Sequence, residues 1–119
     1  MDKRKPTLKQ VDIDNHIATI EMRVDADILD FQGHFTHFPL LPGVTQIDWA
    51  LFYAVEYLNT PTLFKGMEVI KFQEPILPDM CVSLTLSWDA EREKLAFNYT
   101  SISGEKTVVH SSGKMKLGN

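Results

Sequence analysis

Apolar and polar residues alternate along one early segment of the chain. Between residues 16 and 24 the positions His16, Ala18, Ile20, Met22 and Val24 alternate with a second set that includes Thr19, Glu21 and Arg23. This period of two predicts a strand with one buried face. The charged residues 1–10 show no such pattern, so we expect them to be loosely held. A short helical turn is expected over residues 26–31.

A helical pattern follows over residues 43–59. Proline precedes it at position 42, where proline commonly starts a helix. Because a helix that is apolar on nearly every side is usually wrapped by other structure, we expect this helix to lie at the centre of the domain. The apolar positions at helical spacing are Val44, Ile47, Leu51, Val55 and Leu58, and the aromatic residues that widen the apolar surface are Trp49, Phe52, Tyr53 and Tyr57.

After Pro61 the pattern returns to strands. We expect them over residues 64–74, 80–88, 95–99 and 106–117. The connections at residues 90–92 and 103–105 are short and turn-like, which predicts antiparallel pairing as a meander. One long apolar helix followed by such a sheet predicts an α+β domain, with the antiparallel sheet wrapped around the helix.

Length, charge and cysteine content narrow the classes of protein. A chain of 119 residues, 44% hydrophobic and without internal repeats, is expected to form a single domain over residues 1–119. No long apolar stretch follows the N-terminus, so we expect neither a signal peptide nor a membrane helix, and a cytoplasmic location. The net charge of -4 argues against nonspecific nucleic-acid binding. Cys81 is the only cysteine, which excludes an intrachain disulfide and a multi-cysteine zinc site, and we expect it to be a buried thiol.

Asp48 is the candidate for acid chemistry. On a helical wheel it falls between Val55 and Phe52, at the edge of the apolar surface. It is either a rim residue that favours the helix dipole, or a carboxyl that burial keeps protonated and able to deliver a proton. The second reading needs a base. His34 lies in an irregular, proline-containing stretch just before the helix, although a lone loop histidine is more often structural. His16, His37 and His110 have no better claim.

The segment GHFTHFPLLPGVTQID resembles the active-site signature of the FabA/FabZ family of 3-hydroxyacyl-acyl-carrier-protein dehydratases. A histidine, a Pro-Gly pair and an acid fourteen residues after the histidine form a specific combination. Downstream, KFQEPILPD is similar to the strand segment that follows the central helix in that family, and QIDWAL is most similar to the small dehydratases found with aryl-polyene biosynthesis genes. The matching signature positions are Gly33, His34, Phe35, Pro39, Pro42, Gly43, Val44 and Asp48.

The resemblance implies a hot-dog fold. It also implies a (3R)-hydroxyacyl-acyl-carrier-protein dehydratase that forms trans-2-enoyl thioesters in fatty-acid or polyene-type lipid biosynthesis. It implies that neutral His34 removes the C2 proton and that protonated Asp48 assists departure of the C3 hydroxyl. The amides of Gly43 and Val44, at the helix start, are expected to stabilise the enolate oxygen. We expect no metal and no nucleotide cofactor. The candidate substrate-binding residues are Phe35, Phe38, Pro39 and Phe52.

The resemblance also implies partners. It predicts a homodimer in which the histidine and the acid of one site come from opposite subunits, and an acyl carrier protein that delivers the substrate. Because carrier proteins are acidic, we expect lysines near the tunnel mouth to attract them. The candidates are Lys65, Lys71, Lys114 and Lys116.

The chain departs from the family pattern at three places. Thr36 and His37 replace a Pro-Gly pair, Phe52 stands where a glutamine is usual, and the His-Arg-Tyr-Pro-Phe segment near the N-terminus is absent. These differences keep two alternatives open. One is a hot-dog thioesterase, and the other is an acyl-binding hot-dog protein without catalysis. The sequence does not establish whether the enzyme also isomerises its product.

Overall fold

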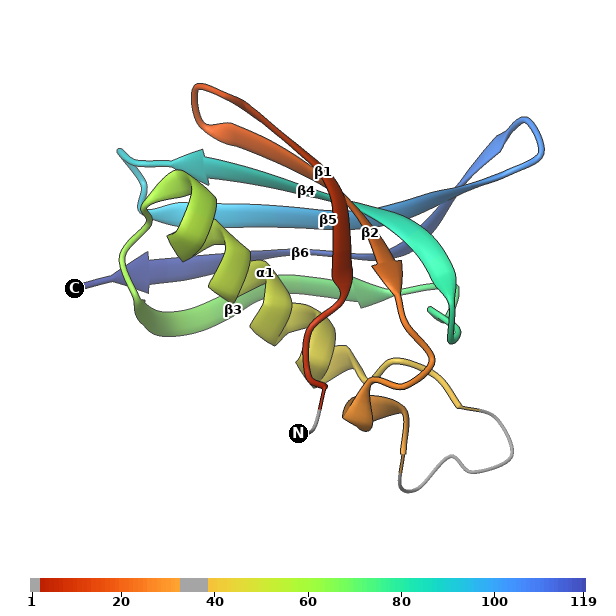
Figure 1. The fold of residues 1–119 in the computed structure, drawn as a ribbon. Coiled ribbons are helices and arrows are strands. Elements are labelled where there is room, and N and C mark those ends of the chain that lie inside the picture. Colours follow the sequence, from red (N-terminus) through yellow and green to blue (C-terminus); the bar gives the residue numbers. More distant parts are fainter. Residues whose placement is uncertain (1–2, 33–38) are drawn as a thin grey trace.

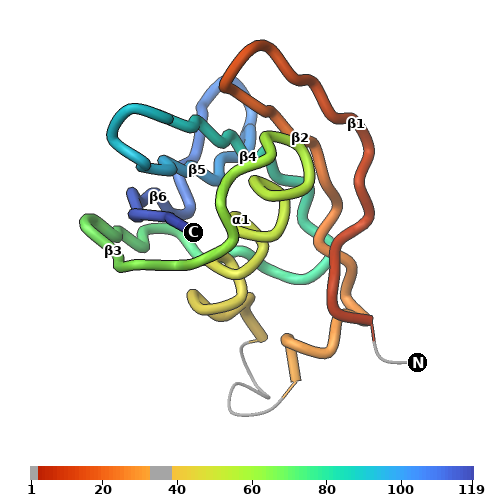
Figure 2. Tube along the Cα trace, turned by 90° about the vertical axis from the view of Figure 1, so that its left-hand side faces the viewer, coloured from red at the N-terminus to blue at the C-terminus, as the bar shows by residue number. Residues whose placement is uncertain are grey.

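One antiparallel sheet with a helix on its concave face makes up the computed structural model, which describes residues 3–32 and 39–119 (Figure 1). Figure 2 shows that the sheet curves around the helix, as the sequence predicted. The elements in chain order are β1 (Thr7–Asp14), β2 (Ile17–Val24), the 3₁₀ turn η1 (Leu29–Phe31), α1 (Gly43–Leu58), β3 (Leu63–Phe72), β4 (Met80–Asp89), β5 (Lys94–Ser103) and β6 (Lys106–Gly118).

The strands lie in the order β1-β2-β4-β5-β6-β3. The meander prediction is therefore correct for β4, β5 and β6 and wrong for β3, which pairs with β6 and not with β4. The chain leaves α1, adds β3 to the free edge of β6, and then crosses the end of the sheet to begin β4. This topology leaves β1 and β3 as the two edge strands.

The N-terminal segment is more ordered than the sequence suggested. Thr7 begins β1, which pairs antiparallel with β2 around a tight turn at Asn15, where φ is 55°. Asparagine tolerates this left-handed conformation better than most residues, so the turn suits it. The expectation of a loose segment fails because β1 is an edge strand with most residues exposed, and such a strand has little apolar alternation to detect.

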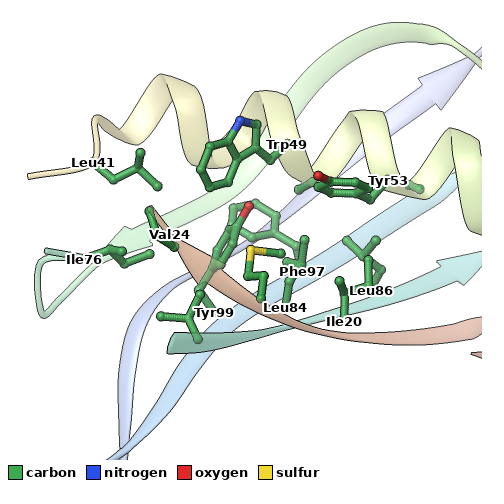
Figure 3. Close-up of a cluster of buried hydrophobic side chains, with 14 of the residues drawn as sticks. Ile20, Val24, Leu41, Trp49, Tyr53, Ile76, Leu84, Leu86, Phe97 and Tyr99 are labelled. Carbon is green, nitrogen blue, oxygen red and sulfur yellow. The ribbon is translucent and has the colours of Figure 1, made fainter. Parts of the chain in front are cut away.

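The core lies between α1 and the sheet. The period-two predictions for β2, β4 and β5 are confirmed, because alternate residues of all three strands are buried (Figure 3). One face of α1, formed by Trp49, Ala50, Tyr53 and Ala54, packs against them. In the part of the chain that the structure describes, the opposite face is exposed, with Val44 at 75% and Phe52 at 46%. The sheet therefore covers one face of the helix.

Cys81 is exposed, so the expectation of a buried thiol is wrong. It stands next to Val82 in β4, and the buried positions of this strand are Val82, Leu84 and Leu86. Side chains of neighbouring strand residues point to opposite faces of a sheet, which directs Cys81 outward.

Candidate active site

Three of the predicted site residues, His34, Phe35 and Phe38, lie outside the described residues. Asp48 is described, and it is exposed on the outward face of α1, one turn before the exposed Phe52. Burial of this carboxyl within its own chain is therefore not observed. The wheel placed Asp48 correctly beside apolar residues, but those residues also face away from the sheet. Any apolar enclosure of Asp48 has to come from outside the described part of the chain.

The start of α1 presents free backbone donors. The amides of Thr45 and Gln46 both donate to the Pro42 carbonyl, at 3.1 and 3.2 Å. Within residues 3–32 and 39–119, the amides of Gly43 and Val44 have no hydrogen-bond acceptor. The first amides of a helix lack intrahelical partners and carry its positive dipole end, so these two groups suit a negatively charged oxygen.

A cavity of about 410 Å³ opens beside this helix start, and its wall mixes apolar and polar side chains. A Cβ atom on Gly43 would lie 2.5 Å from Cζ of Phe72, so a larger residue there requires the half-exposed Phe72 ring to move. The expected role of the Gly43 amide, a hydrogen bond to the enolate oxygen, is not tested by this contact and stays a prediction. Pro39, Phe52 and Asp48 do not belong to the lining. The lining residues are Leu40, Leu41, Gly43, Gln46, Phe72, Gln73, Glu74, Pro75 and His110.

Gln46 fixes the helix start to the sheet. Its side chain is 4% exposed, donates from Nε2 to the Leu41 carbonyl at 3.1 Å and accepts at Oε1 from Ser111 Oγ at 2.6 Å. Its backbone carbonyl accepts from the Tyr99 hydroxyl at 2.7 Å. Burial, with smaller effects of the neighbouring Tyr53 and Asp48, raises the pKa of Tyr99 well above its ordinary value, so the phenol remains a neutral donor.

His110 closes the other side of the cavity. Its Nδ1 lies 3.0 Å from the Glu74 carbonyl and its Nε2 lies 2.7 Å from Ser101 Oγ. A carbonyl only accepts hydrogen bonds, so Nδ1 carries a proton, and in the neutral ring Nε2 then accepts from Ser101. His110 thereby joins β6, β5 and the segment after β3.

Gln46, Phe72 and His110 were not selected from the sequence. Gln46 sits inside the recognised signature and interrupts the apolar face of the helix, which was the available signal. Phe72 and His110 reach the helix start only through the pairing of β3 with β6, in which Phe72 lies opposite Ser111.

The four candidate lysines do not share one location. All are exposed, but Lys71 lies opposite Ser112 at the cavity end of the sheet, whereas Lys116 lies opposite Gly66 towards the far end. Lys65 precedes Lys71 by six residues, which is about 20 Å along an extended strand. The four lysines are thus spread along β3 and β6 and remain candidates, and only Lys71 is the sequence neighbour of a cavity residue, Phe72.

Among residues 3–32 and 39–119, no group of three or more His, Cys, Asp or Glu side chains could hold a metal ion. No helix there has the length and apolar character needed to cross a membrane.

Comparison with known proteins gives one family match. The model of the ApeI-like family, described as ApeI dehydratase, matches residues 10–114. Among curated proteins, the chain is 32% identical over 75 residues to a 3-hydroxyacyl-[acyl-carrier-protein] dehydratase FabZ of Erythrobacter litoralis, covering 55% of this chain and 49% of that protein. It is 29% identical over 92 residues to a FabZ of Herpetosiphon aurantiacus, covering 71% and 65%. The matches therefore span about half to two thirds of these relatives.

Solved structures agree with the fold. A dehydratase heterocomplex, ApeI:P from Xenorhabdus doucetiae, contains a chain with a TM-score of 0.86 and 35% identity, covering 97% of this chain and 99% of that one. An uncharacterized protein from Erwinia carotovora subsp. atroseptica has a TM-score of 0.79 and 39% identity, covering 94% of both chains. The PpsC dehydratase domain from Mycobacterium tuberculosis, at 18% identity and a TM-score of 0.66, shares the fold. The hot-dog fold expected from the sequence is confirmed.

Proposed function

We propose that this chain, which belongs to the ApeI-like dehydratase family, removes water from a (3R)-hydroxyacyl thioester carried on acyl carrier protein, as part of fatty-acid or polyene-type lipid biosynthesis. The observation that carries the proposal is the family match over residues 10–114, which spans a signature containing both His34 and Asp48. The product is the trans-2-enoyl thioester. A cytoplasmic location, expected from the sequence, is part of this proposal.

The proposed reaction needs a base and an acid on neighbouring carbons. His34 takes the proton from C2, and the electron pair moves towards the thioester carbonyl. Asp48 gives a proton to the hydroxyl at C3, which leaves as water. The amides of Gly43 and Val44 would hydrogen-bond to the enolate oxygen, since neither has an acceptor in the described part of the chain. Each acid or base role is worth about 10² to 10⁴ in rate.

A second chain is part of the proposed site. Asp48 is exposed in the described part of the chain, and the edge strand β3 exposes several large apolar side chains. An apolar edge strand is a ready surface for pairing with another chain. We infer a homodimer in which His34 of one subunit and Asp48 of the other form each site. The exposed apolar residues of β3 are Leu63, Phe64, Val69, Ile70 and Phe72.

A different protein chain is the alternative partner, because the similar protein from Xenorhabdus doucetiae was solved as a dehydratase heterocomplex. Light scattering on the purified chain separates the two possibilities. A stable dimer of about twice 13.6 kDa supports the homodimer, and a monomer at micromolar concentration contradicts it.

The test of function is turnover of a 3-hydroxyacyl thioester on carrier protein, followed by enoyl absorbance. We expect His34→Ala and Asp48→Asn to abolish enoyl formation. Glu56→Gln, on the exposed face of the same helix, is the matched control and should retain it. Release of free thiol in place of the enoyl product would identify a thioesterase. Tight acyl binding without turnover would identify a noncatalytic protein.

Mixing variants tests the shared site. A His34→Ala chain combined with an Asp48→Ala chain should regain part of the activity, because one of the two sites in the mixed dimer then holds both reacting residues. Complete inactivity of a purified mixed dimer would refute the shared arrangement while leaving the reaction itself open to the first test.

A further inference from the structure

We propose that Arg4, Asp30 and Thr45 form a positioning network, which holds the first turn of α1, and with it Asp48, against the turn that precedes His34 in the sequence. The proposal rests on the proposed function, because His34 and Asp48 are the reacting residues there. In this proposal, none of the three residues contacts the substrate. They act by holding η1 against α1.

The network begins in residues 3–6, here called the N-terminal strap. Figures 1 and 2 show this red segment beside the orange turn η1. The carbonyl of Lys3 accepts from the amide of Leu29 at 2.8 Å, which fixes the strap to η1. The carbonyl of Arg4 accepts from Nε1 of the buried Trp49 at 3.0 Å, which fixes the strap to α1. The strap therefore bridges the turn and the helix through its backbone.

Asp30 lies at the centre of the network. Its side chain is only 12% exposed and accepts from Nε of Arg4 at 2.8 Å and from Oγ1 of Thr45 at 2.7 Å. Because Arg4 is 60% exposed, solvent screens its ion pair, which is worth little on its own. The bond from Thr45 is the informative one, since Thr45 is 6% exposed and a hydroxyl bonded to a carboxylate is a strong, short hydrogen bond.

The position of these residues in the sequence gives the network its significance. Thr45 is in the first turn of α1, three residues before Asp48, and Asp30 precedes His34 by four residues. In the proposed dimer, the His34 and Asp48 of one chain serve different sites. The bond between Asp30 and Thr45 therefore fixes the helix turn that bears the acid of one site to the segment that leads to the base of the other site. Misplacement of a reacting group by about 1 Å can lower the rate about 10²-fold.

The fold does not depend on this bond. Trp49, Tyr53 and Ala54 hold α1 in the core, and Gln46 anchors its start to Ser111. Loss of the Thr45 hydroxyl should therefore loosen the contact between η1 and α1 without unfolding the domain. A lower kcat in a folded variant would then indicate a positioning role and not a structural one.

The experiment compares Thr45→Val with Thr45→Ser in steady-state turnover. Valine keeps the shape and removes the donor, whereas serine keeps the donor. We expect Thr45→Val to lower kcat about tenfold with KM changed less than about twofold, and Thr45→Ser to stay within about twofold of the wild type. The matched control is Lys3→Met, which removes the strap's ion pairs to Asp25 and Asp27 without touching α1 and should leave kcat unchanged.

A double variant tests whether the residues act as a unit. If they do, Asp30→Asn combined with Thr45→Val should lower kcat no further than the larger single effect. Equal losses in Thr45→Val and Thr45→Ser would overturn the proposal, as would an unchanged kcat in Thr45→Val.

If the wild-type chain has no dehydratase activity, the proposed function is wrong, and kcat can no longer test the network. Amide hydrogen exchange over residues 29–32 and 43–48 then shows whether the Thr45 hydroxyl holds η1 and α1 together. Faster exchange in Thr45→Val but not in Thr45→Ser supports the network, and equal exchange in both refutes it.

Discussion

Replacing Gly113 with alanine should destabilise the domain through two contacts of different kinds. A Cβ atom at this position of β6 would lie 2.6 Å from Cε2 of Phe97 and 2.8 Å from the backbone oxygen of Val69. Neighbouring carbon atoms rest about 3.5–4.0 Å apart, so the new methyl group is about 1 Å too close to the ring. Phe97 is 2% exposed, so its ring is packed within the core.

The magnitude follows from the geometry. The φ of Gly113 is not positive, so alanine adds no backbone strain and would otherwise stabilise the strand slightly. Overpacking of a tight core site costs about 1–3 kcal/mol of unfolding free energy. For a chain of this length that corresponds to a fall in Tm of about 4–12 °C.

Thermal unfolding by circular dichroism at fixed protein concentration measures this effect. Ser112→Ala, the half-buried neighbour in β6, is the matched control and should stay within about 0.5 kcal/mol of the wild type. In a Phe97→Leu background the cost of Gly113→Ala should fall but not vanish, because the Val69 oxygen remains 2.8 Å away. An unchanged Tm in Gly113→Ala would refute the described packing of β3, β5 and β6.

Three further predictions concern other parts of the molecule. Gln46→Leu should lower the unfolding free energy by about 2–4 kcal/mol in urea titrations, because it leaves two buried polar groups without partners. Desolvation acts to raise the pKa of Asp25, but hydrogen bonds from Thr7 and other groups outweigh it and hold that pKa below its ordinary value. Asp25 therefore adds stability above the unfolded pKa of about 3.9, and the deficit of Asp25→Asn at pH 7 should disappear as titrations move below about pH 4. If carrier protein binds near the cavity, Lys71→Glu should raise the KM for the carrier-borne substrate several-fold at low salt, and Lys65→Glu should not. Equal effects of the two substitutions would contradict binding of the carrier near the cavity. With a pantetheine-borne substrate, neither substitution should change KM.

Local patterns predicted the helix and most strands well, because each depends on residues close together in the chain. The helix expected over residues 43–59 is Gly43–Leu58, and the buried alternation expected in β4 is present. Such a pattern shows which side of an element is apolar. It does not show which neighbour covers that side.

Two differences between expectation and structure have this cause. The position of β3 at the sheet edge depends on its pairing with β6, in which paired residues are 39 to 55 positions apart, and no local pattern encodes this pairing. The helix around Asp48 was expected to be wrapped by other structure, with burial of Asp48 as one of two readings, but the described part of one chain leaves Asp48 exposed. Cys81 was predicted wrongly for a different reason. The alternation of β4 directs its side chain outward, but the expectation of burial was based on its residue type alone.

The bond between the Trp49 indole and the Arg4 carbonyl gives the protein a built-in optical reporter. Trp49 is buried, and the hydrogen bond from its indole nitrogen joins the helix to residues 3–6. The sequence holds two tryptophans, so a Trp88→Phe variant would leave Trp49 as the single emitter. Its fluorescence would then follow release of the first residues of the chain from α1, in real time and without a label. An affinity tag fused directly before these residues would perturb the same signal, which makes the C-terminus the better place for one.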